Sequence, residues 1–419
     1  MRVLWLTSIV FPEARSLLCG KENEIKSTGG WMIAAANELQ NNPNVSLAIT
    51  SVMPGIKSIK RLHGKNVIYY LIPQNTAKKG YDYQFERYCR IIHDEFLPDV
   101  VHIHGTENPY GLAYVKACGG DNVVVSIQGL ISVIADYYNY GLTKSDIYKN
   151  ITLRDVFKGD LLAHQKALKK KGIFEVELLK RVSHIIGRTS WDKAHTWAIN
   201  PNAYYHFCNE TLRSEFYTGR WMYEKCTPFS IFVSQASYPV KGVHQLFKAL
   251  PLIISHCPQV TVRIAGVKQA DGVVKRIVKA KGYSRYLSRL AHELSIKEHI
   301  TFLGPLNAEQ MKSEYLRANL FISPSTIENS PNSLGEAQIL GVPCLSSYVG
   351  GAMDMIPNES CGQLYRFEDV EVLAYKVCDI FKQSALFDNS KMRKDALLRH
   401  DPRTNSRALY SIYLSILTH

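Results

Sequence analysis

Short apolar runs alternate with longer stretches of helical periodicity along most of the chain. Apolar runs bounded by polar residues predict buried strands, and apolar residues three and four positions apart predict amphipathic helices. The predicted strands are Val3–Val10, Val45–Val52, Val67–Leu71, Asp99–Glu107, Val123–Ser126, His184–Gly187, Phe229–Ser234, Val260–Ala265, His299–Leu303, Leu320–Ser323 and Cys344–Ser347. The clearest predicted helices are Tyr83–Leu97, Val243–Ile254, Asn307–Arg317 and Ala408–Leu417. Strands that alternate with helices predict an α/β fold with parallel sheets.

The periodicity lapses between Tyr217 and Pro228. A chain of 419 residues is too long for one ordinary domain, and two domains of roughly 200 residues each are expected. We therefore predict one domain over residues 1–217 and a second over 229–395. Residues 396–419 form a C-terminal segment that contains the last predicted helix.

The composition, with 46% hydrophobic and 21% charged residues, is typical of a soluble globular protein. No apolar run reaches the roughly 18 residues of a membrane span. The apolar start, Met1–Phe11, carries one positive charge and precedes no small-residue cleavage site, so we expect a buried strand rather than a signal peptide. The nine cysteines form no CxxC pair. Reduced thiols and a cytoplasmic location are expected.

The net charge of +13 and the pI near 9.2 suit nucleic acid, an anionic membrane surface or a phosphorylated substrate as partner. Neither zinc-finger spacing nor an aromatic RNA-binding motif occurs, so no nucleic-acid partner is expected. Local basic runs are Lys57–Lys65 and His164–Lys171. Each is either a solvated surface or a contact with acidic lipid at the inner face of the plasma membrane.

The loop after the first predicted strand continues into Pro12 and lacks the GxGxxG pattern of dinucleotide-binding domains, which argues against a dehydrogenase. The pair Gly29–Gly30 opens a predicted helix further on. Paired glycines at a helix start allow a ligand to approach bare backbone amides. A Gly-Gly pair alone is weak evidence, because any loop can contain one.

Polar residues follow two predicted strands of the first domain. His104 and Glu107 end one strand, and Gln128 follows the next. Ligands in doubly wound folds gather at the carboxyl ends of strands, so these side chains are candidates for a binding site. His102, by contrast, is expected to alternate within its strand as a structural residue.

The most informative stretch is Leu320–Gly351, which is predicted to form a strand, a loop, a helix, a second strand and a glycine turn. Pro331 suits the first helical position, with Ser330 or Asn329 as the N-cap. A helix that starts directly after a strand presents its amide-rich end at the edge of the sheet.

Two carboxylates flank this helix start. Glu328 lies in the loop and Glu336 lies inside the helix, while the amides of Asn332, Ser333 and Leu334 are expected to lack partners within the helix. An anion site between two hydroxyl-binding carboxylates matches a nucleoside-diphosphate sugar, whose diphosphate joins two polyols. The alternative is an ordinary strand–helix unit with two solvated glutamates.

The whole string, with Ser-Pro-Ser, Glu, Pro-Asn-Ser-x-Gly-Glu-Ala, Gly-Val-Pro and Gly-Gly in this order, closely resembles the C-terminal signature of family 4 retaining glycosyltransferases, of the bacterial polysaccharide-biosynthesis type. The resemblance implies the GT-B fold: α/β, with two doubly wound Rossmann-like domains that face each other across a cleft. It implies that residues 1–217 bind the acceptor, that 229–395 bind the nucleotide sugar, and that the C-terminal helix in 396–419 returns to the first domain.

The resemblance also assigns roles to single residues. Glu328 and Glu336 match the family's Glu-x7-Glu pair, and Glu328 and Lys241 are the implied catalytic residues. The expected donor-binding residues are Gly30, Gln235, Gly304, Leu306, Asn332, Ser333, Leu334 and Glu336, and the expected acceptor-binding residues are Gly29, His104, Glu107 and Gln128.

Two positions depart from the family. Gln128 stands where many members have a histidine, and Gln235 stands where the family has an arginine, six residues before Lys241. A glutamine can bind a sugar hydroxyl but takes up no proton at neutral pH, so a general base is not expected at Gln128. Lys241 and the helix amides are expected to bind most of the diphosphate charge.

The resemblance thus implies a retaining hexosyltransferase that uses a nucleoside-diphosphate sugar such as a UDP sugar. The expected acceptor is a lipid-linked or growing surface polysaccharide. No metal and no cofactor are expected, because Lys241 and the helix amides offset the charge of the leaving diphosphate. The alternatives are a nucleotide-sugar epimerase of the same architecture, a phosphorylase, for which no convincing pyridoxal phosphate lysine stands out, and a sugar-binding protein without activity.

Overall fold

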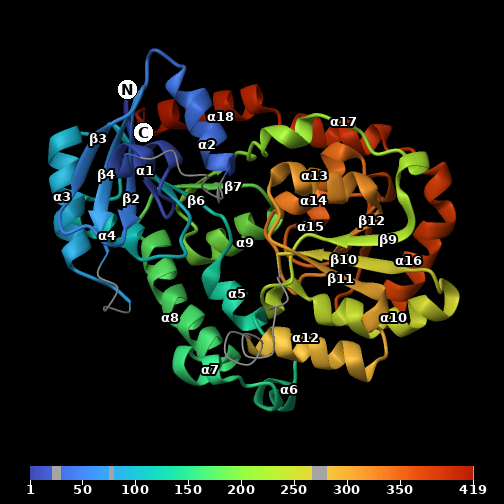
Figure 1. Ribbon diagram of the computed structural model, residues 1–419. Coiled ribbons are helices and arrows are strands. Elements are labelled where there is room, and N and C mark those ends of the chain that lie inside the picture. The colour runs from blue at the N-terminus through green and yellow to red at the C-terminus, as the bar shows by residue number, and fades with distance from the viewer. Residues whose placement is uncertain (21–29, 75–79, 267–280, 419) are drawn as a thin grey trace. The chain divides into compact units, whose positions relative to one another are not determined.

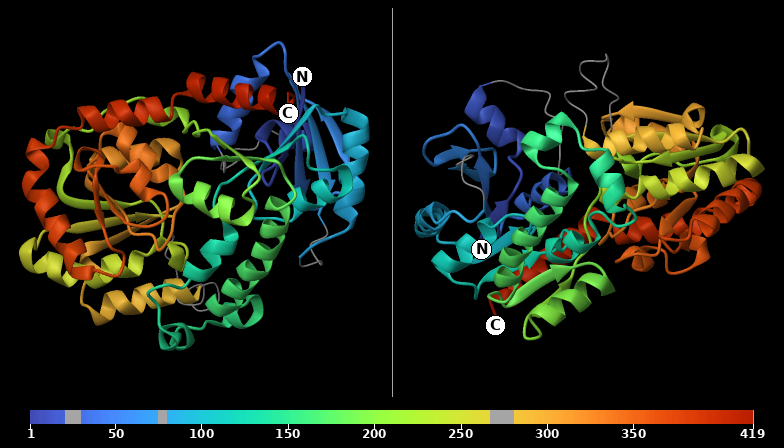
Figure 2. Two further views of the ribbon diagram at one scale, coloured as in Figure 1. Left: turned by 180° about the vertical axis from the view of Figure 1, so that it is seen from behind. Right: turned by 90° about the horizontal axis from the view of Figure 1, so that it is seen from below.

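The computed structural model describes residues 1–20, 30–74, 80–266 and 281–418. The chain divides into two compact units (Figures 1 and 2). The first unit contains Met1–Ser132, Lys169–Leu212 and His400–His419, and the second contains Val133–Leu168 and Arg213–Arg399. The first predicted domain, 1–217, therefore differs from the first unit chiefly in the segment Val133–Leu168, which belongs to the second unit.

The first unit is built on a sheet with the strand order β3-β4-β2-β1-β5-β6-β7-β8, in which the edge strand β3 is antiparallel to its neighbour and the other pairs are parallel. The strands are β1 (Arg2–Thr7), β2 (Ser46–Met53), β3 (Lys60–His63), β4 (Val67–Pro73), β5 (Val100–His104), β6 (Val123–Ser126), β7 (His184–Gly187) and β8 (Tyr204–Phe207). The helices are α1 (Pro12–Cys19), α2 (Gly30–Gln40), α3 (Gln84–Phe96), α4 (Tyr110–Cys118), α9 (Ser190–Ile199) and α18 (Pro402–Ile416).

The last helix, α18, belongs to the first unit and lies beside α2 (Figures 1 and 2). Its apolar face shares a core with the first strand, Val3 and Trp5 included. The Tyr413 hydroxyl accepts a hydrogen bond from the Trp5 indole at 2.9 Å and lies 2.6 Å from Nδ1 of His102. His102 is buried within β5, and its Nε2 lies 2.6 Å from Oγ of Ser126. A buried hydrogen-bonded network of this kind specifies one docking position for the helix.

The second unit is built on a parallel sheet with the order β11-β10-β9-β12-β13-β14. The strands are β9 (Thr227–Val233), β10 (Thr261–Ala265), β11 (Ile300–Gly304), β12 (Ala318–Ser323), β13 (Cys344–Ser347) and β14 (Gln363–Tyr365). The helices are α6 (Lys144–Lys149), α7 (Leu153–Lys158), α10 (Val243–His256), α12 (Gly282–Glu293), α13 (Ala308–Arg317), α14 (Asn332–Leu340), α15 (Ala352–Met355), α16 (Val370–Gln383) and α17 (Ser390–Arg399). Two further helices, α5 (Ile131–Tyr137) and α8 (Leu161–Leu179), contain residues of both units.

The sheet of the second unit is buried on both faces. Ile231 and Val233 of β9 point into one core with α10, α12 and α16, while Phe232 between them points into the other core with α13 and α14. Strands that are covered on both sides are apolar at consecutive positions, which is why the sequence pattern predicts them well. The predicted α/β architecture with two parallel, doubly wound sheets is confirmed.

Candidate functional site

The strand order of the second unit changes direction between β9 and β12. From β9 the chain moves outward to β10 and β11, and it then returns to place β12 on the other side of β9. Loops that leave adjacent strands on opposite faces create a crevice at their carboxyl ends. Lys241 lies in the segment after β9 and Glu328 in the segment after β12, so the topology places both residues at this point.

These two segments are joined by close backbone contacts. The Thr326 amide donates to the Val240 carbonyl at 2.8 Å. Gly242 has φ of 64°, and a Cβ there would lie 1.6 Å from the carbonyl oxygen of Pro324. A side chain at Gly350 would meet the backbone oxygen of Glu328 at 1.8 Å. Glycine is therefore required at both positions, and the segments that carry the candidate residues are held in one arrangement.

Lys241 and Glu328 form an ion pair with 2.5 Å between Nζ and Oε1. The hydroxyl of Ser325 donates to the same carboxylate oxygen at 2.7 Å. Burial alone would lower the pKa of Lys241, but the charge of Glu328, the neighbouring Tyr238 and the hydrogen bond to Glu328 together raise it. Lys241 is thus a cation, and an anion that enters the site would compete with Glu328 for it.

Glu336 is buried on α14 and pairs with Arg213, whose Nε and Nη2 lie 2.9 and 2.7 Å from Oε1. The guanidinium also stacks over the ring of Phe216, 4.7 Å from its centroid. Burial raises the pKa of Glu336 to about 7, although the Arg213 charge and a hydrogen bond from Tyr315 act in the opposite direction. Glu336 therefore changes its protonation state near neutral pH.

Arg213 was not predicted from the sequence. It is the first residue of the second unit after the chain leaves Leu212, and the sequence shows no spacing that connects it with Glu336, 123 positions further on. Only the folded structure places this arginine beside the carboxylate.

The start of α14 differs from the prediction. Pro331 is the N-cap rather than the first helical residue, and neither Ser330 nor Asn329 is the N-cap, because the backbone of Pro331 is still extended, with ψ of 114°. The prediction that the Leu334 amide has no partner is wrong, because this amide donates to the Pro331 carbonyl at 2.9 Å. Asn332 and Ser333 occupy the first two helical positions. The amide of Ser333 has no acceptor earlier in the helix and remains a candidate for an anion contact.

The predicted donor residues Gln235, Gly304 and Leu306 lie at the carboxyl ends of β9 and β11. Oε1 of Gln235 accepts a hydrogen bond from the Tyr238 hydroxyl at 3.4 Å. Gln235 also packs against Gly266, whose amide donates to the Gly304 carbonyl at 2.8 Å. Leu306 is partly buried against the core that Phe232 shares with α13 and α14. The fold thus brings Gln235 and Gly304 to the same edge of the sheet.

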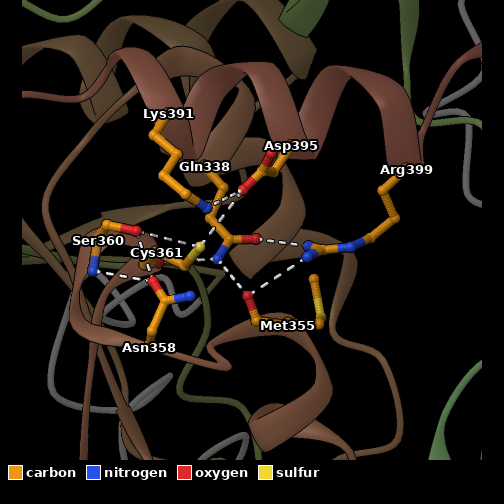
Figure 3. A network of polar contacts seen from close by, with 8 residues as sticks. All are labelled: Gln338, Met355, Asn358, Ser360, Cys361, Lys391, Asp395 and Arg399. Atoms are coloured by element: carbon orange, nitrogen blue, oxygen red, sulfur yellow. Dashed lines mark hydrogen bonds and ion pairs between the residues drawn. The ribbon is translucent and has the colours of Figure 1, made fainter.

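A polar network holds the far half of α14 (Figure 3). Nε2 of Gln338 donates to the carbonyls of Met355 and Cys361 at 2.8 and 2.9 Å, and Nη1 of Arg399 donates to Oε1 of Gln338 at 2.8 Å. Gln338 lies two residues beyond Glu336 on the same helix. The hydrogen bonds of Gln338 therefore also fix the position of Glu336 along the helix axis.

In the first unit, His104 lies at the carboxyl end of β5 and lines two small cavities. Its ring packs against those of His102, Trp5 and Trp31, with centroids 3.7, 4.3 and 5.8 Å away. Among the described residues, neither ring nitrogen of His104 has a hydrogen-bond partner. Burial lowers the pKa of His104 to about 3, so the imidazole is neutral and can bind a hydroxyl group through either nitrogen.

One cavity also contains Arg188 and Glu210, which form a buried ion pair. Nη2 of Arg188 donates to the Ile127 carbonyl at 3.0 Å. Trp31, near the start of α2, lines the same cavity. Arg188 and Glu210 were not predicted as site residues, because they follow different strands and their pairing leaves no pattern in the sequence.

The second cavity contains Glu107, for which burial raises the pKa. The positive φ of Gly105, 86°, accompanies a close approach of the Glu107 carboxylate, which a side chain at Gly105 would block. Gln128 lines neither cavity, and its Nε2 is buried without a partner among the described residues. Gly30 is the first residue of α2, and Gly29 lies outside the described residues.

Within the described ranges, no group of three or more His, Cys, Asp and Glu side chains is arranged to hold a metal ion. None of the helices within the described residues is long and apolar enough to cross a membrane.

Residues 224–396 match a family model described as glycosyl transferases group 1. An uncharacterized glycosyltransferase of Methanocaldococcus jannaschii is 29% identical over 133 residues, which are 32% of this chain and 30% of that protein. The chain spans about a third of the length of the curated relatives it matches.

Two solved structures are similar over the whole chain. Sucrose-phosphate synthase from Thermosynechococcus elongatus has a TM-score of 0.71 at 14% identity and covers 100% of this chain and 99% of its own. Anabaena HepE, solved in complex with UDP-glucose, has a TM-score of 0.64 at 14% identity, with coverage of 99% and 100%. At such identities the likeness shows the fold alone, and it shows that this chain has the predicted GT-B fold.

Proposed function

We propose that the protein is a retaining glycosyltransferase that moves a sugar from a nucleoside-diphosphate sugar to a glycan acceptor. The single observation that carries this proposal is the Lys241–Glu328 ion pair at the strand-order reversal of the second unit, a place where doubly wound folds bind their ligands. The match of residues 224–396 to the glycosyl transferases group 1 model supports it. The UDP-glucose bound by the structurally similar HepE supports a UDP sugar as donor.

In the proposed donor complex, the diphosphate takes Lys241 as its counter-ion in place of Glu328. The raised pKa of Lys241 supports this exchange, because the ammonium stays charged. Glu328, released from the lysine, then accepts hydrogen bonds from hydroxyls of the donor sugar. Glu336, oriented by Arg213, accepts the hydroxyls of the ribose. The amide of Ser333 adds a contact to the phosphate.

In the proposed reaction, the bond between the anomeric carbon and the diphosphate oxygen breaks, and the acceptor oxygen forms a bond to that carbon on the same face. The departing phosphate oxygen takes the proton of the acceptor hydroxyl. The main contribution of the protein is then positioning and stabilisation of the charge on the leaving group, for which Lys241 serves. The proposal includes no metal ion.

On the acceptor side, we assign hydroxyl recognition to the first unit. The neutral imidazole of His104 suits a sugar hydroxyl, and Glu107, with its raised pKa, lines one of the same cavities. Trp31 offers a ring to the apolar face of a sugar. The charge of +13 supports an acceptor on an anionic surface, such as a lipid-linked glycan of a growing polysaccharide at the membrane.

The test begins with a panel of nucleotide sugars in a thermal-shift assay, because a ligand that binds only the folded protein raises its melting temperature. The stabilising donor is then used in turnover assays of Glu328→Ala and Glu336→Ala, with and without a chelator. Both variants should lose at least about a hundredfold in kcat/KM. Wild-type rates in both would show that the site is misplaced, and loss of activity with the chelator would contradict the metal-free mechanism.

Glu314→Ala is the matched control. Glu314 pairs with Arg263 at 2.6 Å, and these two side chains are 16% and 23% exposed, compared with 16% and 24% for Glu328 and Lys241. Glu314→Ala should lower the free energy of unfolding by about as much as Glu328→Ala does, and it should leave turnover unchanged. An isomerised sugar formed without acceptor would assign the site to an epimerase, and donor binding without any turnover would assign it to a binding protein.

A further inference from the structure

Helices α6 and α7 of the second unit carry a group of strongly exposed apolar side chains. Leu153, Val156 and Phe157 are spaced three and four residues apart and therefore share one face of α7. Single exposed apolar residues are common on protein surfaces, but a cluster within so short a segment indicates an interaction site. The exposed fractions are 56% for Tyr148, 57% for Leu153, 69% for Val156 and 86% for Phe157.

Exposed basic residues lie on the same two helices and on the neighbouring α12. Lys144 and Lys149 on α6 and Lys158 at the end of α7 are exposed. Arg285 of α12 is also exposed, and its Nη1 donates to the Ile151 carbonyl at 3.0 Å, between the two helices. We call these four basic residues and the four apolar residues the α6–α7 face.

The acidic residues of the two helices are turned to internal partners. Asp146 caps α6 by accepting from the amide and hydroxyl of Thr143 at 3.0 and 2.7 Å, and it pairs with Arg289 at 3.4 Å. Asp155 is buried and caps α7 by accepting from the hydroxyl of Thr152 at 2.8 Å. The face that remains in solvent is therefore apolar and basic, which is complementary to an anionic partner.

The two helices are also presented in a fixed position. A Cβ at Gly282, the first residue of α12, would lie 2.8 Å from the Asp155 carboxylate, so α12 packs directly against α7. Figure 1 shows α6 and α7 next to α12. The face is thus part of the folded unit, and its apolar side chains protrude from it.

We propose that the α6–α7 face binds the surface of an anionic lipid bilayer. Protruding apolar side chains suit insertion at the boundary between headgroups and acyl chains, while the lysines of the face bind lipid phosphates. A partner helix would instead need a groove, and side chains exposed to 86% do not line one. This inference goes beyond the proposed function, since it concerns a surface and holds whichever reaction the protein catalyses.

The test is co-sedimentation of the full-length protein with vesicles of phosphatidylcholine alone or mixed with phosphatidylserine, at low and high ionic strength. The wild type should sediment with the mixed vesicles at low ionic strength, sediment less with them at high ionic strength, and stay in the supernatant when mixed with neutral vesicles. Absence of binding to the mixed vesicles at low ionic strength would overturn the proposal. So would equal binding to both vesicle types.

Two variants address the two components of the face. The triple substitution L153S/V156S/F157S removes apolar side chains that are already in solvent, so its melting temperature should not change. Its partition onto mixed vesicles should fall at least about tenfold. Wild-type binding of this variant would overturn the insertion of α7.

The partition of the charge variant K144E/K149E/K158E onto mixed vesicles should fall by at least as much, because each lysine near an anionic surface contributes to binding. Binding that is unchanged in this variant would also overturn the proposal.

The matched controls have equally exposed residues elsewhere. K57E/K60E/K65E reverses three exposed lysines of the first unit, and Leu386→Ser removes an apolar side chain that is 89% exposed in the second unit. Both should bind as the wild type does, and an equal loss in the lysine control would show a general charge effect and overturn the assignment. A dimer that disappears in the serine variant, without vesicle binding by the wild type, would assign the face to a second copy of the chain instead.

Discussion

Glu336 should make the binding of a nucleotide sugar depend on pH. The Glu336 carboxylate is proposed to accept hydrogen bonds from the ribose hydroxyls. Both of its oxygens accept hydrogen bonds when it is ionised, whereas the protonated form has an O–H donor on one oxygen. The pKa of about 7 means that about 10% of the carboxyls are ionised at pH 6 and about 90% at pH 8. The affinity for the donor should therefore rise about tenfold, or about 1.4 kcal/mol, from pH 6 to pH 8.

The same shift has a consequence for stability. Its folded-state pKa of about 7 exceeds the ordinary value of 4.5, so the folded form holds the proton more tightly than the unfolded chain. The stabilisation from this group is complete below pH 4.5 and is lost as the pH rises through 7. The difference corresponds to about 3 kcal/mol of unfolding free energy. Glu336→Gln should remove this part of the pH dependence.

The assay is calorimetric titration of a nucleoside-diphosphate sugar at pH 6, 7 and 8. A diphosphate that is esterified at both ends carries no proton that titrates in this range, and His104, with a pKa of about 3, adds none. Glu336→Gln serves as the control and should give a weaker affinity that does not vary with pH. A flat profile in the wild type, together with lost affinity in Glu336→Gln, would refute the assignment of the titration to Glu336.

Two further predictions concern stability. Gly242→Ala should destabilise the protein by more than Gly20→Ala. Both glycines have φ of 64°, which costs an alanine about 1 kcal/mol, but only at Gly242 would the new Cβ lie 1.6 Å from a backbone oxygen. Equal melting temperatures for the two variants would contradict this close contact. Tyr413→Phe should cost about 1–3 kcal/mol in chemical denaturation, because it leaves the buried nitrogens of Trp5 and His102 without their partner, and an unchanged midpoint would show that α18 docks by apolar contacts alone.

The fold could be predicted because its strands are apolar on both faces. The edge strands β3 and β8 were not predicted, and β12 begins at Ala318 rather than at Leu320. Asn319 lies between them, and a polar residue does not suggest a buried strand. In the structure its side-chain oxygen accepts from the Phe229 amide at 3.1 Å, and its backbone amide donates to the Ser230 hydroxyl at 3.0 Å. The side-chain nitrogen has no partner among the described residues, so the polarity is compensated in part, by neighbours that the sequence pattern does not reveal.

The candidate site residues could be named from the sequence only where they belong to a motif or follow a predicted strand. Glu328, Glu336 and the glycines around them lie within one stretch, and Lys241 was named from the family resemblance. Arg213 and Arg188 act through ion pairs with residues on other segments, and such pairs depend on the completed fold. The contact between Leu334 and Pro331 was missed for a local reason, since an extended proline at the N-cap leaves its carbonyl oriented toward the third amide.

The position of α18 has a consequence for the order of events during protein synthesis. The side chains of Leu409, Ile412, Tyr413 and Ile416 belong to the core that surrounds the first strand. They leave the ribosome after every residue of the second unit, which ends at Arg399. The core of the first unit can therefore be completed only after the whole second unit has left the ribosome, although most of the first unit is made first.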